Sequence, residues 1–268
     1  SPGASLNSVY GRHTACVSLD LGEQLLIFDA GSGLAELGKQ IDSEGRRKEA
    51  WLFMSHFHAD HTEGLASFTP ASRKDFKLHI SGAADPDKPL EELVRLAFES
   101  GLAAIKSVQA SIELYELVED SFDVLPGVRL TVFYANHPGT TLGFVVETQS
   151  RKIVYCPDSE LYGEGVTALQ DYDEKLGEIC RGADLMIHDG RFTAEDYLTL
   201  KNHGHSAVDS VVDFAARNEI KRLLLFHHDS SYTDAALDAI AAKAASQAAE
   251  TASSPQVALA RDGLKLSI

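Results

Sequence analysis

Residues 55–62 read Ser-His-Phe-His-Ala-Asp-His-Thr and directly follow the apolar run 51–54. Such a run is typical of a buried strand, so we expect the histidine-rich stretch to form a loop at the end of that strand. Imidazole and carboxylate are ligands that Zn²⁺ prefers. Along so short a loop, His56 and His58 can face one ion while Asp60 and His61 face a second. The stretch predicts a metal site, the alternative being a polar surface loop that is rich in histidine.

This His-x-His-x-Asp-His pattern resembles the signature of the metallo-β-lactamase-fold hydrolases. The resemblance implies that two metal ions draw further ligands from later in the chain. His137, Asp158 and His227 each follow a short apolar run, in the order that the family shows. The implied ligands are His56, His58 and His137 for one ion and Asp60, His61 and His227 for the other, with Asp158 bridging. His228 is an alternative to its neighbour in this set.

Asp29 ends the apolar run 25–28, where the family carries an aspartate that supports the histidine loop. The resemblance therefore gives Asp29 a supporting role. Residues 11–16 resemble a loop that lies near the metals in relatives, so His13 is a candidate for substrate contact, or alternatively a turn residue.

The stretches 185–193 and 203–207 are similar to motifs of the phosphodiesterase branch, which includes ribonuclease Z, the phosphoribosyl cyclic phosphodiesterases and cyclic-nucleotide enzymes. In that branch a histidine in a Gly-His-Ser/Thr stretch touches the scissile phosphate, and an acidic residue orients it. The matching positions here are His205 and Asp189. Ser206 is expected to cap the helix that follows, which would place His205 at the positive end of that helix. The alternative is a capping loop with a hydrogen-bonded histidine.

Two departures from ribonuclease Z bear on the substrate. Asp189 stands where ribonuclease Z usually has glutamate, and no long Gly/Pro-rich arm with a basic tip lies between Gly64 and Lys243. The chain has 24 Lys and Arg against 40 Asp and Glu, a net charge of -16, which repels a polyanion at long range. We therefore expect a small-molecule phosphodiester as the substrate and no long nucleic acid as a partner.

The length of 268 residues and the 44% hydrophobic content predict one domain over residues 1–268. The expected fold class is α/β, a four-layer αββα sandwich, with a native first strand missing before Ser1. The segment 76–116 is weakly patterned and is expected to decorate the pocket. Predicted strands are 16–19, 25–28, 51–54, 78–80, 130–134, 142–147, 153–156, 185–188, 223–226 and 257–260. Predicted helices are 35–41, 90–99, 167–180, 207–217 and 235–249.

The three cysteines, Cys16, Cys156 and Cys180, are too widely spaced for a disulfide framework, which suits a reducing cytoplasm. No apolar run is long enough to cross a membrane, so we expect a cytoplasmic protein with no membrane partner. A homodimer is one arrangement that the sequence allows.

These observations predict a dinuclear metal-dependent hydrolase. The expected reaction is hydrolysis of a cyclic nucleotide or other small phosphodiester through a metal-bridging hydroxide. Zn is the expected metal, with Mn and Fe open, and the expected catalytic residues are Asp60, His205 and Asp189. The alternatives are a carbon-ester or lactone hydrolase on the same fold and a non-enzymatic metal-binding sensor.

Overall fold

The computed structural model describes residues 8–83, 85, 88–99, 107–162 and 170–268. These residues form two compact units, each built around one β-sheet. The N-terminal unit comprises the described residues from 13 to 118. The C-terminal unit comprises residues 8–12 and the described residues from 119 to 268.

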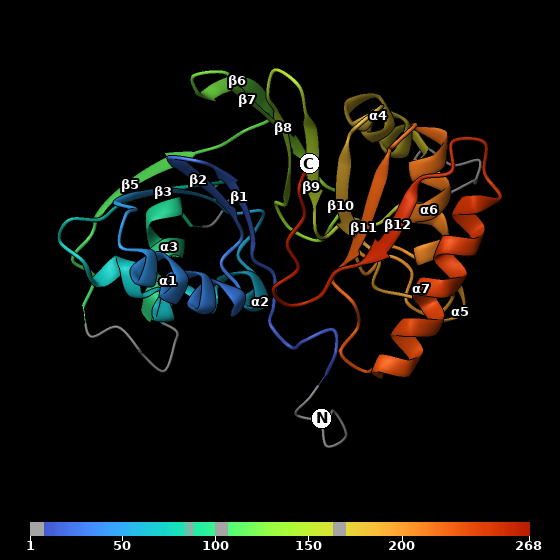
Figure 1. Ribbon diagram of the computed structural model, residues 1–268, viewed down its shortest axis with the longest axis horizontal. Coiled ribbons are helices and arrows are strands. Elements are labelled where there is room, and N and C mark those ends of the chain that lie inside the picture. Colours follow the sequence, from blue (N-terminus) through green and yellow to red (C-terminus); the bar gives the residue numbers. More distant parts are fainter. Residues whose placement is uncertain (1–7, 84, 86–87, 100–106, 163–169) are drawn as a thin grey trace. The chain divides into compact units, whose positions relative to one another are not determined.

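The sheet of the N-terminal unit has five strands within the described residues, in the order β1-β2-β3-β4-β5 (Figure 1). β1 pairs with β2 in antiparallel fashion, whereas β2 to β5 run parallel. The strands are β1 (Val17–Leu21), β2 (Gln24–Phe28), β3 (Glu49–Phe53), β4 (Lys77–Gly82) and β5 (Ser111–Glu116). The helices are α1 (Gly33–Glu44), α2 (Ala59–Thr62) and α3 (Leu90–Glu99), with the 3-10 helices η1 (Leu65–Ser67) and η2 (Thr69–Ser72).

One face of this sheet carries the core of the N-terminal unit. Side chains alternate between the two faces along a strand, so Leu78 and Ile80 of β4 point the same way. Both are fully buried, and they share one apolar cluster with Leu52 of β3, Leu34 of α1 and Val94 of α3. Figure 1 shows α1 and α3 on the same side of the sheet.

The sheet of the C-terminal unit has seven strands within the described residues, in the order β12-β11-β10-β9-β8-β7-β6. β6 to β9 pair in antiparallel fashion and β9 to β12 in parallel fashion, so β9, β10 and β11 end at one edge. The strands are β6 (Asp120–Leu125), β7 (Val128–Tyr134), β8 (Leu142–Glu147), β9 (Lys152–Cys156), β10 (Leu185–Asp189), β11 (Arg222–Phe226) and β12 (Gln256–Leu259).

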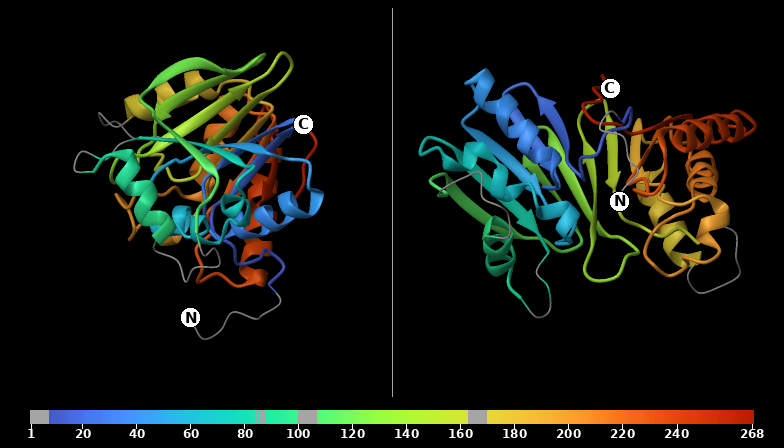
Figure 2. Two further views of the ribbon diagram at one scale, coloured as in Figure 1. Left: turned by 90° about the vertical axis from the view of Figure 1, so that its left-hand side faces the viewer. Right: turned by 90° about the horizontal axis from the view of Figure 1, so that it is seen from below.

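The helices of this unit are α4 (Gln170–Cys180), α5 (Ala194–Tyr197), α6 (Val208–Arg217) and α7 (Asp234–Ala249). α6 and α7 pack on each other, α6 also on β10 and β11, and α7 also on β12 (Figure 2). Val211 and Val212 of α6 are fully buried in a cluster with Val154, Met186 and Leu223 from three neighbouring strands. The apolar face of α6 thus covers the parallel half of the sheet.

Every strand predicted from an apolar run is present, with ends that differ by no more than a few residues. The predictions missed β5 and β6, which lie at sheet edges and carry many polar residues. An edge strand needs no apolar alternation when part of its surface meets water. The predicted helix 167–180 is present as α4, and its residues 167–169 lie outside the described residues.

The segment 76–116 contributes β4, α3 and β5 to the N-terminal unit, and its role in shaping a pocket stays a prediction. Within the described residues, no helix has the length and apolar content that crossing a bilayer requires. The three cysteines carry free thiols. Burial among apolar residues raises the pKa of Cys156 well above its ordinary value, so this thiol stays protonated.

β10 carries His188 into the core of the C-terminal unit. Its Nδ1–H donates to the carbonyl oxygen of Asp189 at 2.8 Å, and its Nε2 has no hydrogen-bond partner among the described residues. Burial lowers the pKa of His188 to about 4, against the raising effect of that hydrogen bond. The ring is therefore neutral in the folded protein at pH values where it is protonated in the unfolded chain.

This difference makes the stability pH-dependent. The pKa of His188 in the folded protein lies below the unfolded value of 6.5. The free energy of unfolding is therefore unaffected by this residue above pH 6.5 and decreases as pH falls toward 4. One such proton lowers the free energy of unfolding by about 1.4 kcal/mol per pH unit. In His188→Phe the fall in unfolding free energy between pH 7 and pH 4.5 should therefore shrink by about 2–3 kcal/mol. Denaturant titrations of both proteins at both pH values test this. The loss of packing in the variant is the same at each pH, so it cancels when the two pH values are compared. An undiminished fall would contradict a neutral buried His188.

Candidate metal centre

In the N-terminal unit, four candidate metal ligands occupy the loop after β3 and the start of α2. His56 and His58 lie in the loop, and Asp60 and His61 lie in α2, for which His58 is the N-cap residue. Five residues separate the end of β3 from the start of α2, so the four donors are confined to six consecutive residues.

A buried carboxylate, Asp29, holds this loop. It follows β2 at a φ of 60°, a backbone conformation that few residues other than glycine adopt. Its Oδ1 accepts the N–H of Ser55 at 2.7 Å, and its Oδ2 accepts the Ser55 hydroxyl and the His61 Nδ1–H, both at 2.8 Å. These bonds fix the His61 ring so that Nε2 is the nitrogen left to bind a metal.

Backbone contacts tie the same two segments together. The N–H of Ala30 donates to the carbonyl of His61, and the N–H of Gly64 donates to the carbonyl of Ala30, each at 2.8 Å. A Cβ on Gly64 would lie 2.0 Å from the carbonyl oxygen of Gly31, so only glycine permits this approach. The sequence places glycines where two loops must meet at backbone distance.

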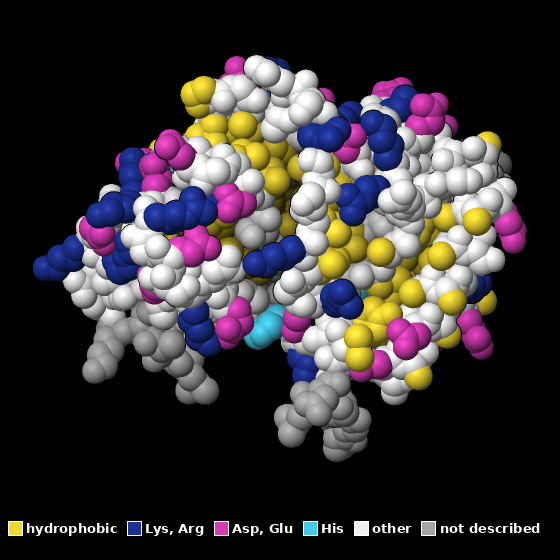
Figure 3. Space-filling view, viewed as in Figure 1, with side chains coloured by type: hydrophobic (Ala, Val, Ile, Leu, Met, Phe, Trp, Pro, Cys, Tyr) yellow, Lys and Arg dark blue, Asp and Glu magenta, His cyan; other side chains and the backbone are white. Residues whose placement is uncertain are grey.

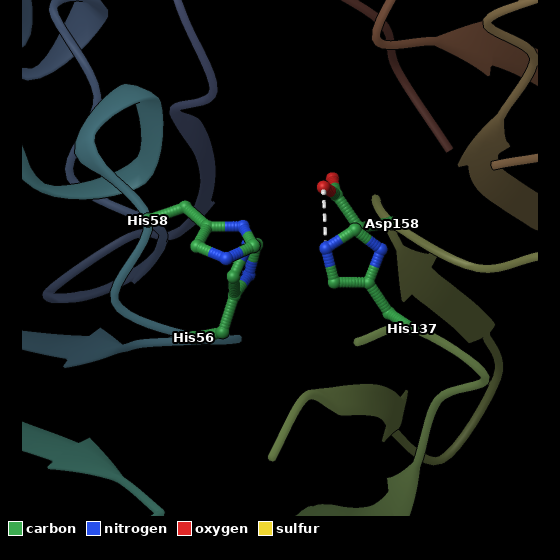
Figure 4. A group of neighbouring side chains, drawn as sticks. All are labelled: His56, His58, His137 and Asp158. Atoms are coloured by element: carbon green, nitrogen blue, oxygen red, sulfur yellow. Dashed lines mark hydrogen bonds and ion pairs between the residues drawn. The ribbon is translucent and has the colours of Figure 1, made fainter. Parts of the chain in front are cut away.

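The donor atoms of this loop face one another in pairs. His56 Nε2 lies 2.8 Å from His58 Nδ1, and Figure 4 shows the two rings turned toward each other. His61 Nε2 lies 3.7 Å from Asp60 Oδ2. The loop thus offers an imidazole pair and an imidazole–carboxylate pair, and their division between two ions stays a prediction.

In the C-terminal unit, three further donors follow strands β7, β9 and β11. They are His137, Asp158 and His227, the last at a φ of 60° like Asp29. His137 Nε2 lies 3.7 Å from Asp158 Oδ2 (Figure 4), and His227 Nε2 lies 3.5 Å from Asp158 Oδ1. Each oxygen of this carboxylate therefore faces a different imidazole, which is how a bridging carboxylate would be arranged.

The three separations between an imidazole nitrogen and a carboxylate oxygen suit a divalent metal. N–H···O hydrogen bonds span about 2.7–3.2 Å, shorter than the 3.5–3.7 Å seen here. Two ligand atoms on one tetrahedral ion with bonds of about 2.1 Å lie about 3.4 Å apart. The Nδ1–H of His137 also donates to the carbonyl of Gly204 at 2.8 Å, which leaves Nε2 as the metal-binding nitrogen. The residues present therefore fit the divalent metals that the donor types imply.

His205 and Asp189 form a hydrogen-bonded pair in the C-terminal unit. Asp189, fully buried at the end of β10, accepts the His205 Nδ1–H at 2.6 Å and the N–H of Arg191 at 2.9 Å. Burial raises the pKa of Asp189 well above its ordinary value, and backbone donors such as the Arg191 N–H oppose that rise. Single donor atoms of His205, His227 and Asp158 lie within 4.8 Å of one another. His205 therefore lies beside Asp158 and His227, the candidate metal ligands.

The predicted helix cap at Ser206 is wrong. The N-cap residue of α6 is Ala207, which makes no side-chain cap. The Ser206 hydroxyl instead donates to the carbonyl of Ser159 at 2.6 Å and accepts the N–H of Leu161 at 2.9 Å. Its partners lie more than forty residues away along the chain, so local spacing could not reveal them. Ser206 therefore fastens the loop that carries His205 to the segment after Asp158.

His13 is exposed in the N-terminal unit, with Nδ1 3.4 Å from the hydroxyl oxygen of Ser32. Its contact with substrate stays a prediction.

Sequence reasoning missed Arg191 and Glu160. The Arg191 guanidinium lies 3.4 Å from both His205 Nε2 and His227 Nδ1. The Glu160 carboxylate is buried and accepts the N–H of Gly204 at 2.8 Å, so it holds the loop before His205. The positions of these residues, two after Asp189 and two after Asp158, were the available signals.

Comparison with known families gives this geometry a context. A family model described as the beta-lactamase superfamily domain matches residues 26–228, more than half of the chain, and so runs through both units.

The chain belongs to the beta-lactamase superfamily.

Ribonuclease Z from Ignicoccus hospitalis is 27% identical over 248 residues, which cover 78% of this chain and 79% of that protein. The crystal structure of the metallo-beta-lactamase fold protein YhfI from Bacillus subtilis has a TM-score of 0.70 and 20% identity, and the match covers 97% of this chain and 92% of that one. Human tRNase Z, short form, has a TM-score of 0.66 and 22% identity, covering 99% and 96%. The predicted metallo-β-lactamase fold and phosphodiesterase branch are confirmed, and the chain is a metal-dependent hydrolase of this superfamily.

The prediction of a small-molecule substrate and no long nucleic acid is wrong, because these superfamily relatives carry the names of RNA-cleaving enzymes. A net charge sums over the whole chain and does not describe the field at one surface. Figure 3 shows Lys and Arg beside Asp and Glu on the described surface, and ion pairs such as Lys243–Asp209 at 2.8 Å mix the two signs. The net charge was therefore a poor guide to the partner.

The contacts of Asp29 generate a prediction about metal affinity. Asp29→Asn keeps the size of the side chain and tolerates the positive φ. It removes the carboxylate that orients His61, so the affinity for Zn²⁺ should fall about 10- to 100-fold. Competition with a chromophoric chelator measures this. Asp123→Asn, at an exposed carboxylate of β6, is the matched control and should bind as wild type. Equal affinities in all three proteins would show that Asp29 does not support the metal site.

Proposed function

We propose that this protein hydrolyses phosphodiester bonds of RNA with two divalent metal ions. One observation carries the proposal: the Asp158 carboxylate faces a different imidazole with each oxygen, and the His205–Asp189 pair lies beside it. Bridging carboxylates are used where two ions act on one phosphoryl group. RNA is the substrate class to which the names of the relatives point.

The number of donors supports a site with two ions. Zinc takes about four ligands, and a catalytic ion leaves one position for water or substrate. The chain carries seven candidate imidazole and carboxylate donors, about as many as two such ions need. The proposed ligands are His56, His58 and His137 for one ion, Asp60, His61 and His227 for the other, and Asp158 for both.

Zinc is the proposed metal, because imidazole nitrogens outnumber carboxylates in the set and Mn²⁺ favours oxygen ligands. When bound, the ions supply Lewis-acid chemistry, which acidifies water and polarises a phosphoryl oxygen. The protein's own contribution is to position the donors. Asp29 orients His61, and Gly204 orients His137.

We propose that His205 protonates the leaving oxygen. Its Nδ1–H is held by Asp189, so only Nε2 remains to contact substrate. The buried Asp189 carboxyl stabilises the protonated ring, from which Nε2–H can be donated to the departing alkoxide. His205 is itself 8% exposed, so little water competes for this position. Asp60 is proposed to orient the attacking water, and its side chain is 43% exposed.

Turnover assays separate this proposal from the alternatives. Zinc-loaded protein should cleave bis-p-nitrophenyl phosphate and a precursor tRNA transcript, should leave a lactone intact, and should lose both activities with a chelator. Lactone hydrolysis without diester cleavage would establish the carbon-ester alternative. Stable metal binding with no turnover of any of these substrates would favour a sensor.

His205 and Asp189 provide a test that separates catalysis from metal binding. Because neither is a proposed ligand, His205→Ala and Asp189→Asn should keep both ions while kcat falls about 100- to 10,000-fold for His205→Ala. The double variant should be little worse than the worse single variant, since the two residues act as one unit. Metal analysis beside kinetics measures this. Loss of metal in His205→Ala would make His205 a ligand, and an unchanged kcat would remove its role.

A further inference from the structure

Arg191 stands directly beyond the strand that ends in Asp189. The chain turns there through Gly190, whose N–H donates to the carbonyl of Phe226 at 3.0 Å. A Cβ on Gly190 would lie 2.8 Å from Leu225 Cδ2, so the turn packs closely on that side chain. The N–H of Arg191 donates to Asp189 at 2.9 Å. The backbone of Arg191 is thus fixed by the carboxyl group that also orients His205.

The side chain of Arg191 is held at one end. Its Nε donates to Asp229 Oδ2 at 3.1 Å, and 29% of the side chain is exposed. A guanidinium has five N–H donors in a rigid fork, and this ion pair uses the one on Nε. The fork therefore keeps donors for a second acceptor.

The other end of Arg191 points at two imidazoles. NH1 lies 3.4 Å from His205 Nε2 and 3.4 Å from His227 Nδ1, and the two rings stack with centroids 5.1 Å apart. Both separations exceed the usual hydrogen-bond length. Neither contact is a good hydrogen bond, so the guanidinium keeps N–H donors for an anionic oxygen beside these two rings.

We infer that Arg191 binds a non-bridging phosphate oxygen of the substrate, beside the oxygen that His205 contacts. This inference rests on the proposed function and deepens it, because it names the residue that recognises the phosphoryl group. Arginine suits this task, since its planar fork can give two parallel hydrogen bonds to one phosphate. Asp229 would keep the fork in place before substrate arrives, so Asp229 is a positioning residue.

Inorganic phosphate is a probe of this contact that needs no turnover. Calorimetry would measure its affinity for the zinc-loaded wild type, Arg191→Gln and Arg191→Lys, with Arg129→Gln as the control at an exposed arginine of β7. Arg191→Gln should bind phosphate at least about tenfold more weakly, because a charge-assisted hydrogen bond is lost. Arg191→Lys, which keeps the charge without the fork, should be intermediate, and Arg129→Gln should match wild type.

Metal content and thermal unfolding of each variant accompany the titrations. A phosphate affinity of Arg191→Gln within about twofold of wild type, or no phosphate binding by wild type, would overturn the inference. If Arg191→Gln loses metal or fold, Arg191→Lys decides, since an unchanged affinity overturns the inference and a weakened one with metal retained supports it. Phosphate binding that depends on Arg191 in a protein that cleaves no diester would instead overturn the proposed function alone.

Discussion

Strands β9, β10 and β11 run parallel, side by side, and deliver Asp158, Asp189 and His227 to one edge of their sheet. The rest of the candidate site depends on this constraint. Parallel neighbours end at the same edge, so residues that follow them meet without any long loop to guide them. The same rule operates in the N-terminal unit, where parallel β2 and β3 end beside each other and Asp29 reaches His61. Strand direction thus assembles groups from distant parts of the chain.

Backbone strain accompanies this arrangement. Asp29 and His227 both adopt a φ of 60° directly after their strands. For residues with a side chain this region is disfavoured by about 1 kcal/mol or more, and such residues gather at functional sites. Packing holds them there, since Phe28 and Leu225 are buried one or two residues earlier. The strained conformation of these two residues turns the chain sharply at the end of each strand.

Much of the fold could be predicted because its strands are apolar runs that end in polar residues. Four of the seven candidate metal ligands lie in the His-x-His-x-Asp-His pattern, and the other three each follow an apolar strand. Edge strands such as β6 were not predicted because part of their surface meets water. The role of Ser206 was not predicted because its partners, Ser159 and Leu161, are distant in sequence. Arg191 was not predicted because its role depends on the histidine rings that its side chain approaches in the folded protein.

The substrate could not be predicted from charge, for a similar reason. A sum over all residues hides where the cations lie, whereas catalysis depends on a few groups within several ångströms of one phosphate. Relatives named ribonuclease Z corrected that prediction. The proposed site suits either substrate, since two ions and an oriented imidazole would act on a phosphoryl group of RNA or of a small ester in the same way.

We propose that seven side chains hold two metal ions that share Asp158. Anomalous diffraction at the zinc edge from crystals of the metal-loaded protein is the sharpest test of this arrangement. We expect two peaks about 3.5–4 Å apart, one beside His56, His58 and His137, the other beside Asp60, His61 and His227, with an oxygen of Asp158 at each. A single peak, or two peaks of which neither touches Asp158, would contradict it.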